Sequence, residues 1–427
     1  MSILKIAIIG AGSSYTPELI EGLVSQKDGL PVDELAFVDI DENRLEIMAG
    51  FCRRLLKRLG HVISITATTD RRKAITDAQF VLTQIRVGGN AQRVLDEKIP
   101  LKYGVIGQET TGPGGMFKAL RTIPVMLEIA KDVEQVNPSS WIINYANPTG
   151  MLAEAVSRYS HARITGLCSG ALHPRWLVSH VLDVPPELVH YDYFGLNHLN
   201  FAYNVRVGDR LITEVEFNRL AEKAAWGAID PAVIKAMKLL PIGYLQYYFH
   251  RSHKVNQARD QAYTRGEEVQ RIEQEVFEAY ANETQDTIPP ALAKRGGGGY
   301  SEVALGVMNA IYNNIDKVII VNVPHQGAVH GFPAEAVFEL PSVINAGGIF
   351  PLHIPEIPRA VWGLVAAVKN YEQLAVEAAV TGNRETALLA LMAHPLVGDY
   401  DVARPMLNEM LEANRSFLPQ FFGEDIL

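Results

Sequence analysis

Two glycines near the start of the chain have the spacing of a turn that binds a dinucleotide. Gly10 and Gly12 stand between a short apolar run, residues 4–9, and a helical pattern that begins near residue 16. Glycine permits a tight turn and lets a phosphate approach the backbone, and the following helix N-terminus offers free N–H groups. Asp39 closes the next apolar run, where a carboxylate can accept the ribose hydroxyls of a dinucleotide.

The loop after Gly12 departs from the usual three-glycine fingerprint. Tyr15 stands where the third glycine is expected, and Ser13 and Ser14 precede it. A lone Gly-x-Gly turn also follows many strands that bind no cofactor. Because this turn is N-terminal and an acid follows at the expected distance, we predict that the loop and the acid form a dinucleotide site. The acid favours NAD over NADP.

Three further side chains have types that can act on a substrate, and each also has a structural explanation. Cys168 follows an apolar run at the edge where doubly wound sheets bind ligands, although a free cysteine is most often a small buried hydrophobe. His198 lies in a polar break before a strand and can equally be a hydrogen-bonded structural histidine. Tyr244 begins an aromatic cluster whose helical spacing is also that of a core stripe. Taken singly, these residues leave both explanations open.

Two arginines and an asparagine have the chemistry to hold an anionic sugar. Arg93 follows a glycine pair, and Arg295 precedes the glycine-rich loop 296–299. Guanidinium groups bind phosphate through paired hydrogen bonds, but either arginine could simply be solvated. Asn147 precedes Pro148 at a strand end, where its amide can exchange hydrogen bonds with sugar hydroxyls or serve the turn itself.

The first part of the chain has the pattern that brings such residues to one edge of a sheet. Short apolar runs alternate with helical patterns, which predicts parallel βαβ units. We expect a doubly wound, Rossmann-like α/β domain that binds NAD over residues 1–170. Its strands are expected at 4–9, 34–38, 62–66, 80–84, 141–144 and 163–167, and its helices at 16–25, 42–59 and 117–136.

The pattern changes after residue 170, where we expect a metal- and substrate-binding catalytic domain of α+β type over residues 171–427. Residues 200–207 alternate apolar with polar and turn through Gly208 and Asp209, which predicts an antiparallel hairpin. The expected elements beyond it are a helix at 267–282, a buried strand at 318–323, and helices at 360–381 and 403–414.

Composition excludes several classes of protein. The 427 residues carry a net charge of −9 without a run of Lys or Arg, which argues against a nucleic-acid or anionic-membrane surface. A phosphorylated ligand then needs a local basic pocket. The two cysteines, Cys52 and Cys168, fit a reducing compartment, so we expect a cytoplasmic protein. No apolar run approaches the ~18 residues that a membrane span needs.

Ordered motifs along nearly the whole chain resemble those of glycoside hydrolase family 4, and within it the 6-phospho-β-glucosidases. The motifs include Gly10-Ala11-Gly12-Ser13-Ser14-Tyr15-Thr16-Pro17, Gly107-Gln108-Glu109-Thr110-Thr111-Gly112, Asn147-Pro148, Gly166-Leu167-Cys168, Gly195-Leu196-Asn197-His198-Leu199, Tyr244-Leu245-Gln246-Tyr247-Tyr248 and Lys294-Arg295-Gly296-Gly297.

The resemblance implies a fold like that of lactate and malate dehydrogenases, and a mechanism unlike that of most glycosidases. Bound NAD+ oxidises the sugar at C3, a tyrosinate removes the acidified C2 proton, the C1 substituent leaves, water adds, and the hydride returns. Tyr244 matches the base, and Cys168 with His198 matches the metal ligands, the usual metal being manganese. Arg93 and Arg295 are expected at the 6-phosphate and Asn147 at the sugar. By analogy of fold, we expect a homodimer or homotetramer.

Two departures from the family pattern leave alternatives open. Ser169-Gly170-Ala171 replaces the branch's usual Asn-Val-Pro, and the absence of a carboxylate there disfavours α-glycosides. His325-Gln326 stands where an Asn-Asn turn is usual, so another sugar specificity is one alternative. A lactate/malate-type NAD dehydrogenase is a second, but it gives the Cys–His pair and the tyrosine no role. A nucleotide-binding protein with a dead site is a third.

Overall fold

A computed structural model describes residues 4–296 and 298–423 of the chain. A single nine-stranded sheet runs through it, in the order β13-β12-β11-β6-β5-β4-β1-β2-β3. The first six strands are mutually parallel, and their order, 3-2-1-4-5-6, is that of dinucleotide-binding folds. They are β1 (Lys5–Ile9), β2 (Glu34–Val38), β3 (Ser64–Thr68), β4 (Phe80–Thr83), β5 (Trp141–Asn144) and β6 (Arg163–Gly166).

The central strands are apolar on both faces because helices cover the sheet from both sides. In β1, Ile6 and Ile8 enter one hydrophobic cluster, while Ala7 and Ile9 enter the other. The helices on the Ile6 face are α1 (Thr16–Ser25), α2 (Glu42–Arg58), α12 (Arg265–Ala281) and α14 (Tyr300–Tyr312). Those on the Ala7 face include α5 (Pro113–Val136), α6 (Thr149–Tyr159) and α15 (Arg359–Thr381). This double burial explains the continuous apolar runs that predicted the strands.

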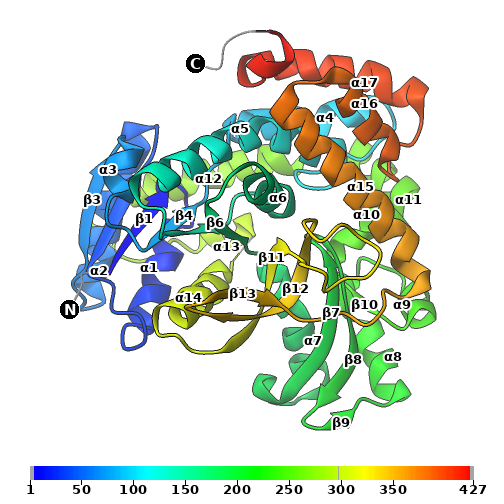
Figure 1. The fold of residues 1–427 in the computed structure, drawn as a ribbon, viewed down its shortest axis with the longest axis horizontal. Coiled ribbons are helices and arrows are strands. Elements are labelled where there is room, and N and C mark those ends of the chain that lie inside the picture. The colour runs from blue at the N-terminus through cyan, green and yellow to red at the C-terminus, as the bar shows by residue number, and fades with distance from the viewer. Residues whose placement is uncertain (1–3, 297, 424–427) are drawn as a thin grey trace.

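The second half of the chain continues the same sheet. Strands β11 (Lys317–Pro324), β12 (Val337–Asn345) and β13 (Gly348–Pro351) join β6 in antiparallel order. A separate antiparallel sheet contains β7 (Val189–Leu196), β8 (Leu199–Val207), β9 (Arg210–Leu211) and β10 (Leu240–Pro241). Figure 1 shows β7, β8 and β9 extending toward the bottom of the view, while α16 (Arg384–Ala393) and α17 (Tyr400–Ala413) lie at its top. The predicted boundary at residue 170 therefore separates segments that share a sheet.

The remaining helices connect and cover these sheets. They are α3 (Arg71–Ile75), α4 (Gly89–Lys102), α7 (His173–Leu182), α8 (Glu214–Ala221), α9 (Pro231–Met237), α10 (Gln246–Phe249), α11 (Arg251–Asp260), α13 (Ala291–Arg295), α16 (Arg384–Ala393) and α17 (Tyr400–Ala413). None of the helices in the described ranges combines the length and apolar character needed to cross a membrane. Gly297, part of the predicted glycine-rich loop, lies outside the described residues.

Most predicted elements exist, with differences at their ends. Strand β3 begins two residues later than predicted, because Val62 is 92% exposed and its apolar character does not mark a core position. Helix α5 begins at Pro113 rather than residue 117, since proline suits a first helical turn and the glycines that follow obscure the pattern. The hairpin through Gly208 and Asp209 is confirmed, as β8 pairs with β9.

Candidate active site

A cavity of 1390 Å³ opens at the carboxyl ends of the parallel strands. Loops after β1, β2, β4 and β5 contribute to it from the first half of the chain, and segments of α12, α13 and the turn after β10 contribute from the second. Most of the residues that the sequence singled out line this one cavity: Gly10, Gly12, Ser13, Ser14, Tyr15, Asp39, Arg93, Asn147, Tyr244 and Arg295.

The glycine turn has no room for side chains. Gly10 adopts a left-handed φ of +87°, and a Cβ there would lie 3.0 Å from the carbonyl carbon of Gln84. The backbone N–H of Gly12 donates to Asp39 Oδ2 at 2.8 Å, and a Cβ on Gly12 would lie 2.7 Å from the same oxygen. The turn and the acid are thus fitted to each other at the start of α1, which is the arrangement expected of a dinucleotide site.

The side chains of Ser14 and Tyr15 turn toward the protein. Ser14 Oγ donates to Glu273 Oε1 at 2.5 Å, and the Tyr15 hydroxyl donates to the carbonyl oxygen of Gly296 at 2.5 Å. Arg295 lies over the Tyr15 ring and pairs with Glu273 Oε1 at 2.5 Å. These contacts fasten the glycine loop to α12 and α13, so the predicted roles of Ser14 and Tyr15 at NAD rest on their backbone more than on their side chains.

Arg93 belongs to a buried cluster of charges that sequence reasoning did not foresee. Its Nη1 lies 3.3 Å from Glu109 Oε2, which also contacts Arg86 Nη1 at 2.8 Å and Lys118 Nζ at 3.3 Å. Glu97 pairs with Arg93 Nε at 2.8 Å. Three basic side chains thus face two carboxylates, so basic groups outnumber acidic ones here in a chain of negative net charge.

Burial and the neighbouring charges both shift the pKa values of the groups in this cluster. Burial would raise the pKa of Glu109, but Lys118, Arg93 and Arg86 hold it well below its usual range. Burial lowers the pKa of Lys118, Arg86 adds to this and Glu109 opposes it, with a net value of about 7. Glu109 belongs to the motif of residues 107–112, but no chemical role was predicted for it. Lys118 lies in the predicted helix 117–136, and nothing in the helical pattern distinguishes it as a site residue. Arg86, Glu109 and Lys118 all line the cavity.

Hydrogen bonds fix the tautomer of His198. Gln108 Oε1 accepts from the backbone N–H groups of Thr110 and Thr111 at 2.8 and 2.6 Å, which identifies this atom as the oxygen. The Thr110 hydroxyl donates to the same oxygen at 2.9 Å, so it must accept from His198 Nδ1–H at 2.7 Å. Nε2 is left with its lone pair, as metal-binding histidines require. Burial lowers the pKa of His198 to about 3, so the ring is neutral.

Cys168 lies at the end of β6, close to the turn that carries His198. Its Sγ accepts from the backbone N–H of Gly170 at 3.3 Å, and the side chain of Asn197 also bonds to it. Because Asn197 directly precedes His198, this bond links Cys168 to the turn that carries His198. Both are buried, and neither lines the cavity wall. Burial, with a smaller contribution from Glu339, raises the pKa of the Cys168 thiol to about 12, so a thiolate here needs a cation.

A thiol and an imidazole fit a catalytic divalent metal. Within the described ranges, no group of three or more His, Cys, Asp or Glu side chains is placed to hold one. A metal held by Cys168 and His198 would therefore keep positions open for oxygen ligands from substrate or water, as catalytic sites do.

Tyr244 lies directly on His198. The two rings are stacked, with centroids 3.7 Å apart and planes at 7°. The tyrosine is in the turn Gly243–Leu245, which follows β10 and is held by the pairing of β10 with β8. Burial would lower the pKa of Arg93, yet Glu109, Glu97 and Tyr244 raise it, which puts the phenol close to this guanidinium. Sequence reasoning looked to a metal alone as the cation near Tyr244.

Asn147 and His325 have different relations to the cavity. Asn147 lines it after β5, and its Oδ1 accepts from the backbone N–H of Thr149 at 3.4 Å. His325 is buried outside it, where Nε2 bonds the carbonyl oxygen of Pro333 at 2.7 Å and Nδ1 accepts from two backbone N–H groups. The unusual histidine therefore supports its own turn and does not contact the cavity.

A buried carboxylate ties the His198 turn to the large sheet. Glu339 in β12 accepts from the Tyr193 hydroxyl at 2.6 Å and from Asn200 Nδ2 at 2.7 Å. It also accepts from Asn197 Nδ2 at 3.3 Å and from Asn322 Nδ2 at 3.0 Å. Each carboxylate oxygen therefore faces two donors, and the donors come from both sheets.

Glu339→Gln should lower the free energy of unfolding by about 2–4 kcal/mol, because the new amide group faces two donors and hydrogen bonds to a charged group are each worth ~1.5–3 kcal/mol. Urea denaturation followed by circular dichroism measures this loss. Glu283→Gln, at an exposed position, is the matched control and should leave the midpoint unchanged. An unchanged midpoint for Glu339→Gln would contradict the role of this carboxylate.

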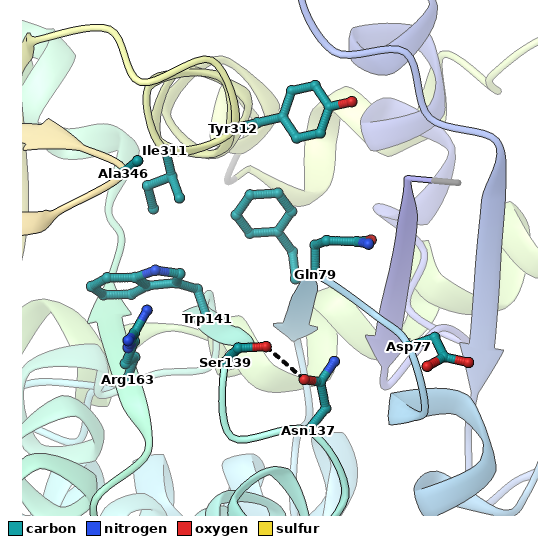
Figure 2. Close-up of a pocket in the computed structure, with 10 residues that line it drawn as sticks. Asp77, Gln79, Asn137, Ser139, Trp141, Arg163, Ile311, Tyr312 and Ala346 are labelled. Atoms are coloured by element: carbon teal, nitrogen blue, oxygen red, sulfur yellow. Dashed lines mark hydrogen bonds between the residues drawn. The ribbon is translucent and has the colours of Figure 1, made fainter. Parts of the chain in front are cut away.

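A second cavity of 600 Å³ lies at the opposite, amino-terminal ends of β4, β5 and β6. Figure 2 shows Trp141 and Arg163 on one side of it and the Ser139–Asn137 hydrogen bond on another. None of the predicted site residues lines it. It is therefore not part of the candidate active site.

Comparison with known proteins agrees with this arrangement. Residues 5–184 match the model of the family 4 glycosyl hydrolases, and residues 193–397 match that of the family's C-terminal domain. A Bacillus subtilis protein named "Probable 6-phospho-beta-glucosidase" is 43% identical over 99% of this chain and 98% of its own length. A 6-phospho-alpha-glucosidase of Lacticaseibacillus paracasei is 32% identical over 97% of this chain and 98% of its own.

Solved structures match over similar lengths. The 6-phospho-beta-glucosidase of Thermotoga maritima, solved with manganese, NAD+ and glucose-6-phosphate, has a TM-score of 0.89 at 34% identity and covers 97% of this chain and 99% of its own. A malate dehydrogenase of Plasmodium falciparum has a TM-score of 0.54 at 13% identity over 88% of this chain and 100% of its own, a likeness of fold alone. The expected fold class, a Rossmann-like domain followed by a malate-dehydrogenase-like part, is confirmed.

Proposed function

This chain is a family 4 glycosyl hydrolase, and we propose that it hydrolyses 6-phospho-β-glucosides with NAD and a divalent metal, manganese being the expected one. One observation carries the proposal. The glycine turn, Asp39 and Tyr244 line one cavity, His198 stacks on Tyr244, and Asn197, which precedes His198, bonds to Cys168. The higher identity to the 6-phospho-beta-glucosidase than to the alpha-acting relative supports the β assignment.

The chain's residues fit both cofactors. The backbone of the glycine turn and the Asp39 carboxylate would hold NAD, and Cys168 with His198 Nε2 would hold the metal. When bound, NAD supplies a reversible hydride acceptor at C3 and the metal supplies a Lewis acid at the sugar oxygens.

Tyr244 is the proposed general base that takes the C2 proton. Its stack on His198 puts the phenol beside the proposed metal ligand, and Arg93 lies close enough to stabilise a tyrosinate. An unperturbed tyrosine has a pKa near ~10, so a base at neutral pH needs such positive charge around it. No pair of carboxylates is required at C1 in this scheme, in contrast to direct displacement.

The group of basic side chains around Glu109 is the proposed place for the 6-phosphate. Arg93, with Arg86 and Lys118 beside it, can offer N–H donors to phosphate oxygens. Arg295 is proposed at the same end of the substrate but already pairs with Glu273, so its share of the phosphate should be smaller.

Arg93→Ala should therefore reduce kcat/KM for a phosphorylated glucoside about 10- to 150-fold relative to its unphosphorylated counterpart, the equivalent of one charged hydrogen bond of ~1.5–3 kcal/mol. Taking the ratio of the two substrates in the same variant removes any general damage to the site. Arg206→Ala, at a partly exposed arginine of β8 that does not line the cavity, is the matched control. If the ratio of the two kcat/KM values in Arg93→Ala equals that of the wild type, the phosphate does not bind at Arg93.

An activity panel tests the function as a whole. Aryl α- and β-glucosides, each with and without a 6-phosphate, are supplied with NAD+, Mn²⁺ and a thiol reductant. We expect turnover of the phosphorylated β-glucoside alone. Equal hydrolysis of plain and phosphorylated glucosides would refute the phosphate assignment, and steady accumulation of NADH would indicate a dehydrogenase. The homo-oligomeric state and the cytoplasmic location stay predictions.

A further inference from the structure

A large aromatic side chain stands exposed at the cavity beside Tyr244. Trp226 lines the cavity, and 55% of its surface is exposed. An exposed indole offers a large apolar face that a ligand can cover. This tryptophan has no place in the proposed chemistry at C2 and C3.

The backbone at Trp226 is held in a strained conformation. Ala225 and Trp226 are consecutive non-glycine residues in the left-handed region, with φ of 53° and 57°, and Gly227 follows with φ of 71°. Left-handed backbone is unfavourable for a residue that carries a Cβ, and such strain persists only where the surroundings impose it. The turn Ala224–Gly227 therefore holds Trp226 in one orientation, although its backbone conformation is unfavourable.

The indole of Trp226 packs against the backbone of Gly243, the residue before the proposed base Tyr244. A Cβ on Gly243 would lie 1.8 Å from Cε3 of Trp226, so the ring rests directly on this glycine. The indole also meets the Tyr244 ring edge-on, with centroids 6.1 Å apart and planes at 80°. Its position is thus tied to Tyr244, at the sugar end of the cavity, and not to Asp39, where the cofactor's ribose is expected.

Two more rings follow Trp226 in a chain of contacts, and of the three rings Trp226 is the one that lines the cavity. His173 meets Trp226 edge-on at 4.5 Å between centroids, and Trp176 lies 5.6 Å from His173. Trp176 is itself 42% exposed. We call Trp226, His173 and Trp176 the aromatic ledge. Burial lowers the pKa of His173, so the ledge is neutral near pH 7.

We propose that the aromatic ledge is the binding site for the leaving group, and that it takes an aromatic aglycone stacked on Trp226. The inference rests on the proposed function, because the sugar must lie at Tyr244 for its C1 substituent to reach the ledge. A neutral aromatic surface offers stacking rather than ion pairing, and aromatic pairs of this kind gain ~0.5–1.5 kcal/mol beyond buried area.

The test compares two substrates that differ only in the leaving group: phenyl and methyl 6-phospho-β-glucoside. In Trp226→Ala, the ratio of kcat/KM for phenyl over methyl should fall about 2- to 13-fold from its wild-type value. Trp226→Phe should restore much of the ratio, since it keeps an aromatic face. Trp362→Ala, at another exposed tryptophan on α15, is the matched control and should leave the ratio unchanged.

A direct binding measurement separates the ledge from the chemistry. Isothermal titration of a phenyl C-glucoside 6-phosphate, whose C1–carbon bond offers no leaving group, should show weaker binding to Trp226→Ala than to the wild type, by a similar factor. Equal losses for phenyl and methyl substrates, or a change in sedimentation that accompanies them, would overturn the proposal by making Trp226 structural or part of a subunit contact. If the wild type hydrolyses neither substrate, the proposed function fails instead.

Discussion

Cys168→Ser should leave a folded protein that has lost at least about 100-fold of its hydrolytic activity. Removing even an indirect partner of a metal ligand typically costs ~10- to 100-fold, and a serine hydroxyl is a much poorer ligand than a thiolate. The substitution is nearly isosteric, and a hydroxyl oxygen can still accept from the backbone N–H of Gly170, as the sulfur does. The loss should therefore lie in the metal and not in the fold.

Metal removal and a spectroscopic signal distinguish a loss of the metal from a loss of the fold. Chelator should silence the wild type, and added Mn²⁺ should restore it. With Co²⁺ in place of manganese, the wild type should show thiolate-to-cobalt charge-transfer absorption that Cys168→Ser lacks. Cys52→Ala changes the other cysteine, which is buried in α2 away from the cavity, and should retain the absorption. Undiminished activity of the wild type in chelator would refute the metal site.

The parallel sheet was predictable because burial on both faces leaves a simple record in the sequence. Strands such as β2, Glu34–Val38, are continuous apolar runs, and the predicted range agrees with the observed one. Strand β7 was not predicted, since Val189–Leu196 contains His190 and Asp192 on a partly exposed face. Exposed antiparallel strands mix polar and apolar residues in ways that resemble loops.

Site residues could be predicted where the residue type itself limits the possible chemistry. They could not be predicted where only the three-dimensional arrangement of the chain gives a residue its role. Gly10 and Cys168 could be chosen from type and position along a strand. The contact between Glu109 and Lys118 depends on the meeting of a loop with the start of α5, and no local pattern records it. Trp226 is one of four tryptophans, and it is distinguished by its strained turn and by its packing against Gly243, which appear only in the structure.

Tyr244→Phe should reduce turnover by ~10²- to 10⁴-fold, the usual contribution of a general base. The variant isolates the hydroxyl, because a phenyl ring can keep the stack on His198 at 3.7 Å between centroids and the edge contact with Trp226. NAD+ affinity should be unchanged, since the glycine turn and Asp39 lie at the other end of the cavity. The matched control is Tyr248→Phe, at a neighbouring tyrosine whose hydroxyl faces His394 and which does not line the cavity.

Isotope incorporation shows which proton Tyr244 removes. A base that takes the C2 proton exchanges it with solvent, so wild-type turnover in deuterated water should place deuterium at C2 of the product sugar. With substrate and NAD+ present, Tyr244→Phe should lose this exchange together with turnover, because the variant lacks the hydroxyl that acts as the proposed base. A variant that lost turnover but kept exchange would assign Tyr244 to a later step. Product without C2 deuterium from the wild type, at a rate indifferent to NAD+, would mean that the glycosidic bond breaks by direct displacement, which requires two carboxylates at C1.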